Sequence, residues 1–441
     1  MNWLRLLVVP LALGTLVAQT LEIGPAVELA FEAVTGKGYQ LRASDDLTHW
    51  RPAGGPLLAL SGSQTTLLPA AETNRYFQLS SHDVRDLNGL LEPIRVANGV
   101  PALACAVVVS NRIVGLGAVG LRKAGVTNAP VTLQDRWHHG SLTKSVTATL
   151  AGILVEAGQI RWDTTLAEVF PLQAAKMNAA WRTVTLDWLC SNRGGAPGDL
   201  GPSGIWSQLW NFGGTPTEGR RLLLEKLTAL APASTPGTKY EYSNASFSLA
   251  GHMLETVMGK SWEELVGERL FAPLDMRSGG FGVPATPRMI NQPWGHQWAG
   301  GKPSPVEPGT GADNPPAIGP AGTVHCSVID LAKYVAFHLA GEQGDTAMLT
   351  RATVQKLHTA PPNNGSYAYG WVASDRPWAG TGKALNHAGS NTQWHSVIWM
   401  APARQFGVVA LCNLATSSGA NPGATANDQI AGKMIQEFLS Q

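Results

Sequence analysis

The sequence predicts an α/β (α+β) protein in which an antiparallel sheet is flanked by helices, with an inserted helical region and a small all-β module in front. Three observations support this prediction. Apolar strand pairs lie near both ends of residues 81–441, helical patterns fill the middle, and strand patterns without a long helix occupy residues 26–80. Strands at both ends of a domain with helices between them imply one sheet built from both termini.

We expect residues 19–80 to form the small all-β module. The runs VELAFEA, YQLRAS, TTLLP and RYFQLS are typical of short strands, and TGKG, DDLTHWRPAGG and SGSQ are typical of the turns between them. A packing or spacing role is the simplest interpretation of such a module. Trp50 and Tyr76 are candidates for binding a carbohydrate or a surface.

Residues 81–441 are expected to form the second and larger domain. Asp83–Ala97 has the pattern of an amphipathic helix, and residues 102–110 and 113–120 form a predicted hairpin. A second hairpin is predicted from 391–400 and 406–413, followed by a last helix at Thr425–Leu439. The sheet part would comprise about 81–140 and 320–441, and the helical part about 141–319. The Pro- and Gly-rich stretch 279–322 is long for a loop, which is typical of a functional or surface-wrapping segment.

One stretch in the middle suggests chemistry. From Ser145 to Gly158 (SVTATLAGILVEAG) only Glu156 is charged, and a helix this apolar on most faces is usually buried. Ser141 and Lys144 precede this run and are three residues apart, so they share one helix face. An amine at the positive end of a buried helix loses its proton more easily than one in water.

Composition and charge exclude several classes of partner. The 441 residues carry 32 basic and 31 acidic side chains, so neither nucleic acid nor an anionic membrane is an expected partner.

At the N-terminus, Arg5 precedes an apolar run at 6–17 and the small residue Ala18, which indicates a secretory signal peptide at residues 1–18. The alternatives are a membrane anchor and a buried first helix, but the run is short for a span and no later stretch qualifies. We therefore expect a periplasmic or secreted protein without a stable membrane span after cleavage.

Four cysteines, Cys105, Cys190, Cys326 and Cys412, are widely spaced and form no CxxC pair. Cys105 and Cys412 both lie in apolar, strand-like runs where they could be neighbours, and buried free thiols are the favoured interpretation. His138 and His139 lack a third ligand at plausible spacing, so no metal site is predicted. No cofactor is expected either.

Ser141 and Lys144 form a Ser-x-x-Lys pattern, which by itself is expected about once by chance in a chain of this composition. Two further motifs occur later in the chain. The first is PGTKYEYSN, with Tyr242 and Asn244, directly before a helical pattern at 245–259. The second is NHAGS, with His387, before the predicted strand at 391–400. Each also has a structural interpretation: a helix cap at Ser141, a surface lysine, a core tyrosine and a loop histidine.

Taken together and in this order, the three motifs resemble the serine β-lactamase-like and penicillin-binding-protein superfamily. The similarity is to the class C-like branch, which includes D-Ala-D-Ala carboxypeptidases, D-aminopeptidases and esterases. It covers roughly residues 84–440, with further support from LCSNRGGAP and GPAGTVHCSVIDLAKY. The resemblance implies a β-lactamase-like serine hydrolase domain at 81–441.

The resemblance also implies roles for individual residues. Ser141 would be the nucleophile that forms an acyl-enzyme, Lys144 its general base, and Tyr242 the group that relays the proton. Backbone N–H groups of Ser141 and Ser390 would form the oxyanion hole. The residues that would bind substrate are Asn244, His387, Gly389 and Ser390.

One departure from the family pattern bears on the substrate. His387 stands where a true β-lactamase usually carries lysine, and a neutral imidazole gives no fixed charge for a substrate carboxylate. We therefore predict an exported serine hydrolase acting on an ester or amide, of the esterase or D-amino-acid peptidase type, with a small molecule or a peptide as substrate. The alternatives are a β-lactamase proper and a catalytically silent binding protein of the same fold. The sequence leaves the oligomeric state open.

Overall fold

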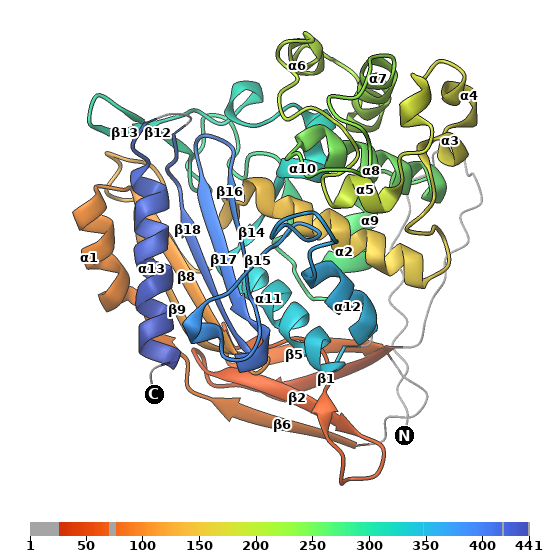
Figure 1. Ribbon diagram of the computed structural model, residues 1–441. Helices are drawn as coiled ribbons and strands as arrows, with labels where there is room; N and C mark the ends of the chain where they lie inside the picture. The colour runs from red at the N-terminus through yellow and green to blue at the C-terminus, as the bar shows by residue number, and fades with distance from the viewer. Residues whose placement is uncertain (1–25, 70–75, 347, 417–418, 440–441) are drawn as a thin grey trace, which may run out of the picture.

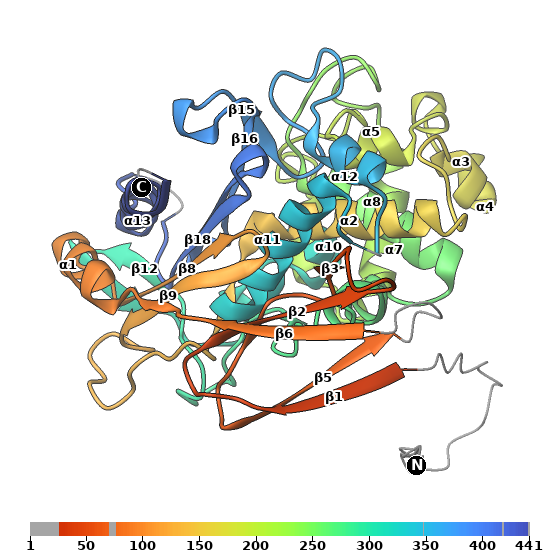
Figure 2. The same cartoon turned by 90° about the horizontal axis from the view of Figure 1, so that it is seen from below.

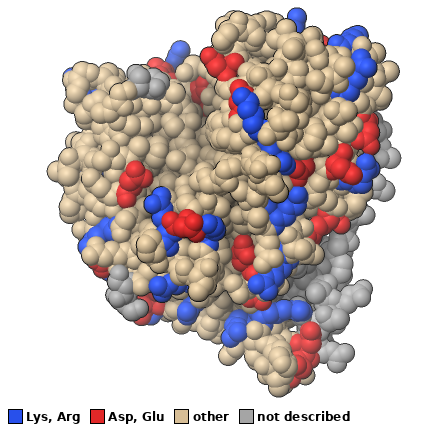
Figure 3. Space-filling view, in the orientation of Figure 1, with Lys and Arg blue, Asp and Glu red and all other residues tan. Residues whose placement is uncertain are grey.

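The computed structural model describes residues 26–69, 76–346, 348–416 and 419–439 (Figure 1). The predicted signal peptide at residues 1–18 lies outside the described residues. Among the helices that are described, none combines the length and apolar character needed to cross a bilayer. On the face shown in Figure 3, acidic and basic side chains are interspersed over a mostly uncharged surface.

A seven-stranded sheet forms the centre of the larger domain, in the order β15-β16-β17-β18-β8-β9-β7. Every pairing is antiparallel except that of β7 with β9. The strands are β7 (Arg85–Asp86), β8 (Ala102–Val109), β9 (Arg112–Gly120), β15 (Val372–Ser374), β16 (Ala384–Ser390), β17 (His395–Ala401) and β18 (Phe406–Cys412). Because β8 pairs with β18, the prediction of one sheet built from both termini is confirmed.

Helices cover both faces of this sheet. On one face, α1 (Asn88–Asn98) and α13 (Pro422–Leu439) pack against Leu103, Cys105 and Val107 of β8. On the other face, Ala104 and Ala106 belong to the same hydrophobic core as buried residues of α2 (Thr143–Glu156) and α11 (Val328–Gln343). Figure 2 shows both helices on the side of the sheet away from α1 and α13. Neighbouring side chains of a strand point to opposite faces of the sheet. Because helices cover both faces, the β8 side chains on both faces must be apolar, which explains the continuous apolar run of β8.

The helical region lies beside one edge of the sheet and contains α2, preceded by the 3-10 turn η1 (Gly140–Leu142). The predicted helical pattern at 245–259 corresponds to the helix α8 (Asn244–Met258). The remaining elements of the region are α3 (Leu166–Val169), α4 (Pro171–Ala174), η2 (Ala179–Trp181), α5 (Leu186–Cys190), α6 (Ile205–Trp210), α7 (Pro216–Thr228), α8 (Asn244–Met258), α9 (Trp262–Val266) and η3 (Gly267–Phe271).

The Pro- and Gly-rich segment returns the chain from the helical region to the sheet. It contains short strands and turns, and β14, which directly follows it, pairs with both β10 and β11 in a small sheet. The elements in and around it are β10 (Arg136–His138), β11 (Gly280–Phe281), β12 (His296–Ala299), β13 (Lys302–Pro305), η4 (Thr310–Ala312), η5 (Pro316–Ile318), α10 (Gly319–Gly322), β14 (Val324–Ser327), α12 (Arg351–His358), η6 (Pro377–Ala379) and η7 (Pro402–Arg404).

The first described residues form strands, as predicted for this part of the chain. One pair and one four-stranded sheet contain β1 (Ala26–Glu32), β2 (Gly38–Ser44), β3 (Arg51–Pro52), β4 (Leu57–Leu58), β5 (Ser63–Pro69) and β6 (Tyr76–His82). They lie at the lower end of the molecule in Figure 1, against the β8–β9 hairpin. One direct link is the imidazole of His82, whose Nε2 donates to the carbonyl oxygen of Ile113 at 2.9 Å.

Several predicted boundaries were wrong. The first helix starts at Asn88 instead of Asp83, because Arg85 and Asp86 pair with β9. The strand expected from residue 391 begins at His395, and the residues before it turn the chain from β16 into β17.

All four cysteines are buried free thiols, as favoured from the sequence. Cys105 and Cys412 lie on paired strands but oppose Ala410 and Leu103, respectively.

Candidate active site

Ser141 lies in the tight turn η1, which runs directly into α2. The turn needs glycine at position 140, because its φ is +50° and a Cβ there would lie 2.4 Å from the backbone nitrogen of Ser390. The half-buried Ser141 therefore follows a backbone that is pressed against β16. This contact joins residues that are about 250 positions apart in the chain.

The side chain of Lys144 is fully buried, with 0% of its surface exposed. Its Nζ lies 3.1 Å from Ser141 Oγ, 2.6 Å from Asn244 Oδ1 and 2.9 Å from the carbonyl oxygen of Ala321. No carboxylate forms an ion pair with it in the described part of the chain. Burial lowers the pKa of Lys144 well below its usual range, because desolvation penalises the ammonium form.

Tyr242 and Asn244 approach this amine from the start of α8. Ser243 between them is extended and caps the helix, so the side chains on either side of it project in similar directions. The ring centre of Tyr242 is 4.6 Å from Lys144 Nζ. Burial raises the pKa of Tyr242 to about 12, and a hydrogen bond with Ser141 acts in the opposite direction. At neutral pH, Tyr242 is therefore a phenol that can donate a proton.

The third motif lies on a strand, which corrects the interpretation of His387 as a loop residue. His387, Gly389 and Ser390 all belong to β16. A Cβ at Gly389 would lie 1.9 Å from the carbonyl oxygen of His139 and 2.9 Å from the backbone nitrogen of Ser141. Glycine at this position therefore allows the strand to touch the Ser141 turn.

His387 is an uncharged member of the site. Burial, and to a lesser extent Lys144, lower the pKa of its imidazole to about 3. Its ring centre is 6.4 Å from that of Tyr242, and its Nδ1 has no hydrogen-bond partner in the described part of the chain. The structure thus brings together the side chains or backbone of all seven predicted site residues: Ser141, Lys144, Tyr242, Asn244, His387, Gly389 and Ser390.

A second layer of contacts, which the sequence did not predict, holds the Ser141 turn. The Gly140 N–H donates to His138 Nδ1 at 3.1 Å, so His138 carries its proton on Nε2 and donates it to Asp313 at 2.9 Å. Asp313 lies in the Pro- and Gly-rich segment, whose length was the only sequence signal for such a role. His139 contacts Cys326 through Nε2 at 3.0 Å. Within the described ranges, no three potential metal-ligating side chains cluster together.

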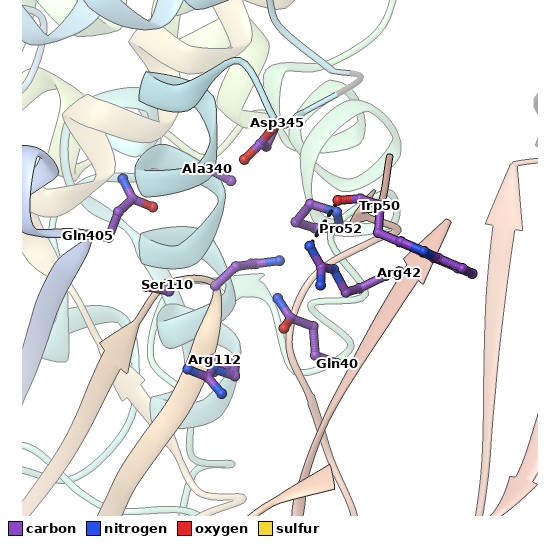
Figure 4. Close-up of a pocket in the computed structure, with 10 residues that line it drawn as sticks. Gln40, Arg42, Trp50, Pro52, Ser110, Arg112, Ala340, Asp345 and Gln405 are labelled. Atoms are coloured by element: carbon purple, nitrogen blue, oxygen red, sulfur yellow. Dashed lines mark hydrogen bonds between the residues drawn. The ribbon is translucent and has the colours of Figure 1, made fainter. Parts of the chain in front are cut away.

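Two cavities differ in their relation to the site. One of about 170 Å³ is lined by Asn244 and by residues 198–200, 206 and 245. A larger one of about 360 Å³ lies between β2, the β8–β9 turn and the end of α11, with Arg42, Trp50 and Asp345 around it (Figure 4). None of the seven predicted site residues lines the larger cavity, so only the smaller one adjoins them.

Comparisons with known proteins agree with this geometry. The family model described as Beta-lactamase matches residues 87–433. Penicillin-binding protein 4 of Amycolatopsis lactamdurans is 26% identical over 335 residues, covering 72% of this chain and 82% of that protein. Unguisins hydrolase ungD' of Aspergillus campestris is 24% identical over 316 residues, covering 68% of this chain and 56% of that protein.

Solved structures show the same fold. The octameric penicillin-binding protein homologue from Pyrococcus abyssi superposes with a TM-score of 0.63 at 22% identity, covering 80% of this chain and 78% of that one. D-alanine carboxypeptidase AmpC from Burkholderia cenocepacia gives 0.59 at 21% identity, covering 78% and 96%. The predicted fold class is confirmed.

Proposed function

The chain belongs to the beta-lactamase family of serine hydrolases, and from that premise we propose that it forms an acyl-enzyme at Ser141 on an ester or amide substrate. The single observation that supports this most is the buried Lys144, whose Nζ lies 3.1 Å from Ser141 Oγ and, among the described residues, forms no ion pair with a carboxylate. A charged lysine buried without a counter-charge lowers the stability of the folded state, so burial favours the uncharged form. The site therefore holds a neutral amine beside a hydroxyl, as general-base catalysis requires.

The contacts of Lys144 suit a general base. A neutral amine has two N–H donors and one lone pair. The Asn244 and Ala321 oxygens accept the two donors, and the lone pair is then left for the hydroxyl of Ser141. We propose that Ser141 Oγ attacks the substrate carbonyl carbon while its proton moves to Lys144 Nζ.

The remaining steps use the other motif residues. The carbonyl oxygen becomes an oxyanion that accepts hydrogen bonds from the backbone N–H groups of Ser141 and Ser390, and such a donor is typically worth about 3 kcal/mol. The bond to the leaving group then breaks, and the Tyr242 phenol delivers the proton from Lys144 to it. Water hydrolyses the acyl-enzyme with the same groups acting in reverse. The Nδ2 group of Asn244 has no hydrogen bond within the described residues and is proposed to bind the substrate.

The substrate is proposed to be an ester or a D-amino-acid peptide instead of a β-lactam. With a pKa of about 3, His387 stays neutral above roughly pH 4 and offers no ionic contact to the carboxylate that β-lactams carry. The same property argues against a peptide whose free terminal carboxylate must be bound at this position.

A comparison of three substrates on one preparation tests this proposal. We expect measurable hydrolysis of a nitrophenyl ester, slower or undetectable release from a D-Ala-D-Ala peptide, and the poorest kcat/KM with a chromogenic cephalosporin. Rapid cephalosporin turnover would instead identify a β-lactamase and contradict the role given to His387. A folded protein that hydrolyses none of the three and takes no covalent serine probe would be a binding protein of this fold.

Export is proposed from the sequence alone, since the first 25 residues lie outside the described part. We expect cleavage after Ala18 when the full chain is expressed in a bacterial host with a secretion system. Amino-terminal sequencing of the purified protein should then begin at Gln19. Recovery of the intact Met1 terminus from the cytoplasmic fraction alone would count against export.

A further inference from the structure

The cavity beside Asn244 has a chemical character of its own. It measures about 170 Å³ and adjoins the reaction centre, because Asn244 Oδ1 lies 2.6 Å from Lys144 Nζ. The loop after α5 forms one wall, α6 contributes another, and the first turn of α8 closes it. Its lining residues are Gly198, Asp199, Leu200, Trp206, Asn244 and Ala245.

Asp199 is the one charged side chain in this lining. It is exposed, and no ion pair within the described residues neutralises it. One carboxylate oxygen accepts from the Gly201 N–H at 2.7 Å, which fixes the group in place and leaves its other oxygen available. A fixed carboxylate beside a cavity attracts a cationic group.

Trp206 lines the same cavity from α6 and is partly exposed. The face of an indole attracts an ammonium or guanidinium group more strongly than any other aromatic side chain does. A carboxylate and an indole around one small cavity therefore form a pair suited to a cation.

Among the described residues that line the cavity, none carries a competing positive side chain. His387 is neutral, and desolvation favours the neutral form of Lys144. The N-terminus of α8 does point a partial positive charge toward the cavity, of about half an elementary charge. One backbone N–H of that turn, that of Ser246, already donates to the hydroxyl of Ser243. The partial charge of the helix end is also smaller than the formal charge of the Asp199 carboxylate.

We propose that the site selects substrates bearing a cationic substituent, ammonium or guanidinium, close to the reacting carbonyl. Asp199 and Trp206 are the specificity-determining residues. This inference rests on the proposed function, in which Ser141 is acylated. It also disfavours anionic substrates, since Asp199 repels a carboxylate and the described cavity lining offers no cation to bind one.

Three matched nitrophenyl esters test the proposal. Their hexanoate chains end in a trimethylammonium group, in its uncharged isostere tert-butyl, or in a carboxylate. The trimethylammonium group keeps its charge at every pH and cannot attack the ester. For the unmodified protein we expect kcat/KM for the cation to exceed that for tert-butyl by about tenfold, and the carboxylate to be the poorest. The cation preference should shrink as salt is added, because a partly exposed pair is screened.

Variants assign this preference to the cavity. Asp199→Asn should bring the cation-to-tert-butyl ratio of kcat/KM close to one, and Trp206→Leu should lower it in part. Asp83→Asn removes the same charge from an exposed site and should keep the full ratio. An unmodified protein without cation preference, or an Asp199→Asn variant that retains it, would overturn the proposal.

A binding measurement separates this proposal from the proposed function. The primary amides of the same three acids, which the Ser141→Ala variant is expected not to hydrolyse, are titrated calorimetrically into that variant. Tighter binding of the cationic amide, lost in the Ser141→Ala/Asp199→Asn double variant, supports the cavity assignment even if no ester acylates Ser141. Equal binding of the three amides contradicts it even if Ser141 is acylated.

Discussion

Replacing Ser141 by alanine is expected to abolish both ester turnover and covalent labelling by a fluorophosphonate or penicillin probe. The hydroxyl is the only group in the proposed mechanism that bonds covalently to the substrate, and no other nucleophilic side chain of the described residues lies within hydrogen-bond distance of Lys144 Nζ. Loss of a catalytic serine in a comparable unit lowers kcat by about 10⁶-fold. The measurements are kcat/KM on the best ester and intact-protein mass after incubation with the probe.

Ser145→Ala is the matched control for this experiment. Ser145 lies in the same motif, but its hydroxyl donates to the Leu142 carbonyl oxygen and accepts from Tyr334, away from the amine. This variant should still gain the mass of the probe, with the label mapped to Ser141. A Ser141→Ala protein that is still labelled and still turns over substrate would refute the assignment of the nucleophile.

Lys144→Ala is expected to be nearly as damaging, because the nucleophile and its base act as a unit. A loss of about 10³-fold or more in kcat/KM is expected, and the Ser141→Ala/Lys144→Ala double variant should be no worse than Ser141→Ala alone. Lys144→Arg should not restore activity, since a guanidinium stays protonated at every accessible pH. Independent, additive losses in the double variant would contradict a shared role.

The pH dependence of the unmodified enzyme follows from the lowered pKa of Lys144. Below that pKa the amine is protonated and cannot accept the serine proton, so kcat/KM on an uncharged ester should rise as the pH increases through it. His387 titrates near 3 and Tyr242 near 12, so neither accounts for a limb between these values. His387→Gln should therefore keep the limb. A limb that disappears in His387→Gln would assign the base to His387 instead.

Elements whose sequence carries a local signal were predictable. The apolar runs of β8 and β18 and the nearly uncharged pattern of α2 predicted the sheet and the buried helix, because burial on both sides disfavours charged residues. Strand β16 was missed because the polar residues Asn386, His387 and Ser390 interrupt its apolar pattern. Its placement depends on pairing with β17, which no short window of sequence encodes.

Prediction of the candidate site was limited in the same way, because contacts between distant segments leave no local signal in the sequence. Resemblance to a family identified Ser141, Lys144 and the downstream motifs, and the geometry brings them together. It did not identify Asp313 or the Ala321 carbonyl, since these contacts join segments more than 170 positions apart. The division of the chain between residues 80 and 81 remains a prediction.

The pairing of β8 with β18 also sets the order in which the protein can fold. Leu103 lies opposite Cys412, so this strand pair joins positions more than three hundred residues apart. Closing such a long loop is slow, and it requires almost the whole chain. A nascent chain can form α2 early, but it cannot place the Ser390 backbone beside Gly140 until the last hairpin has been synthesised. The surroundings of Ser141, the proposed nucleophile, are therefore assembled last, so partly made or truncated chains would lack the arrangement proposed to activate it.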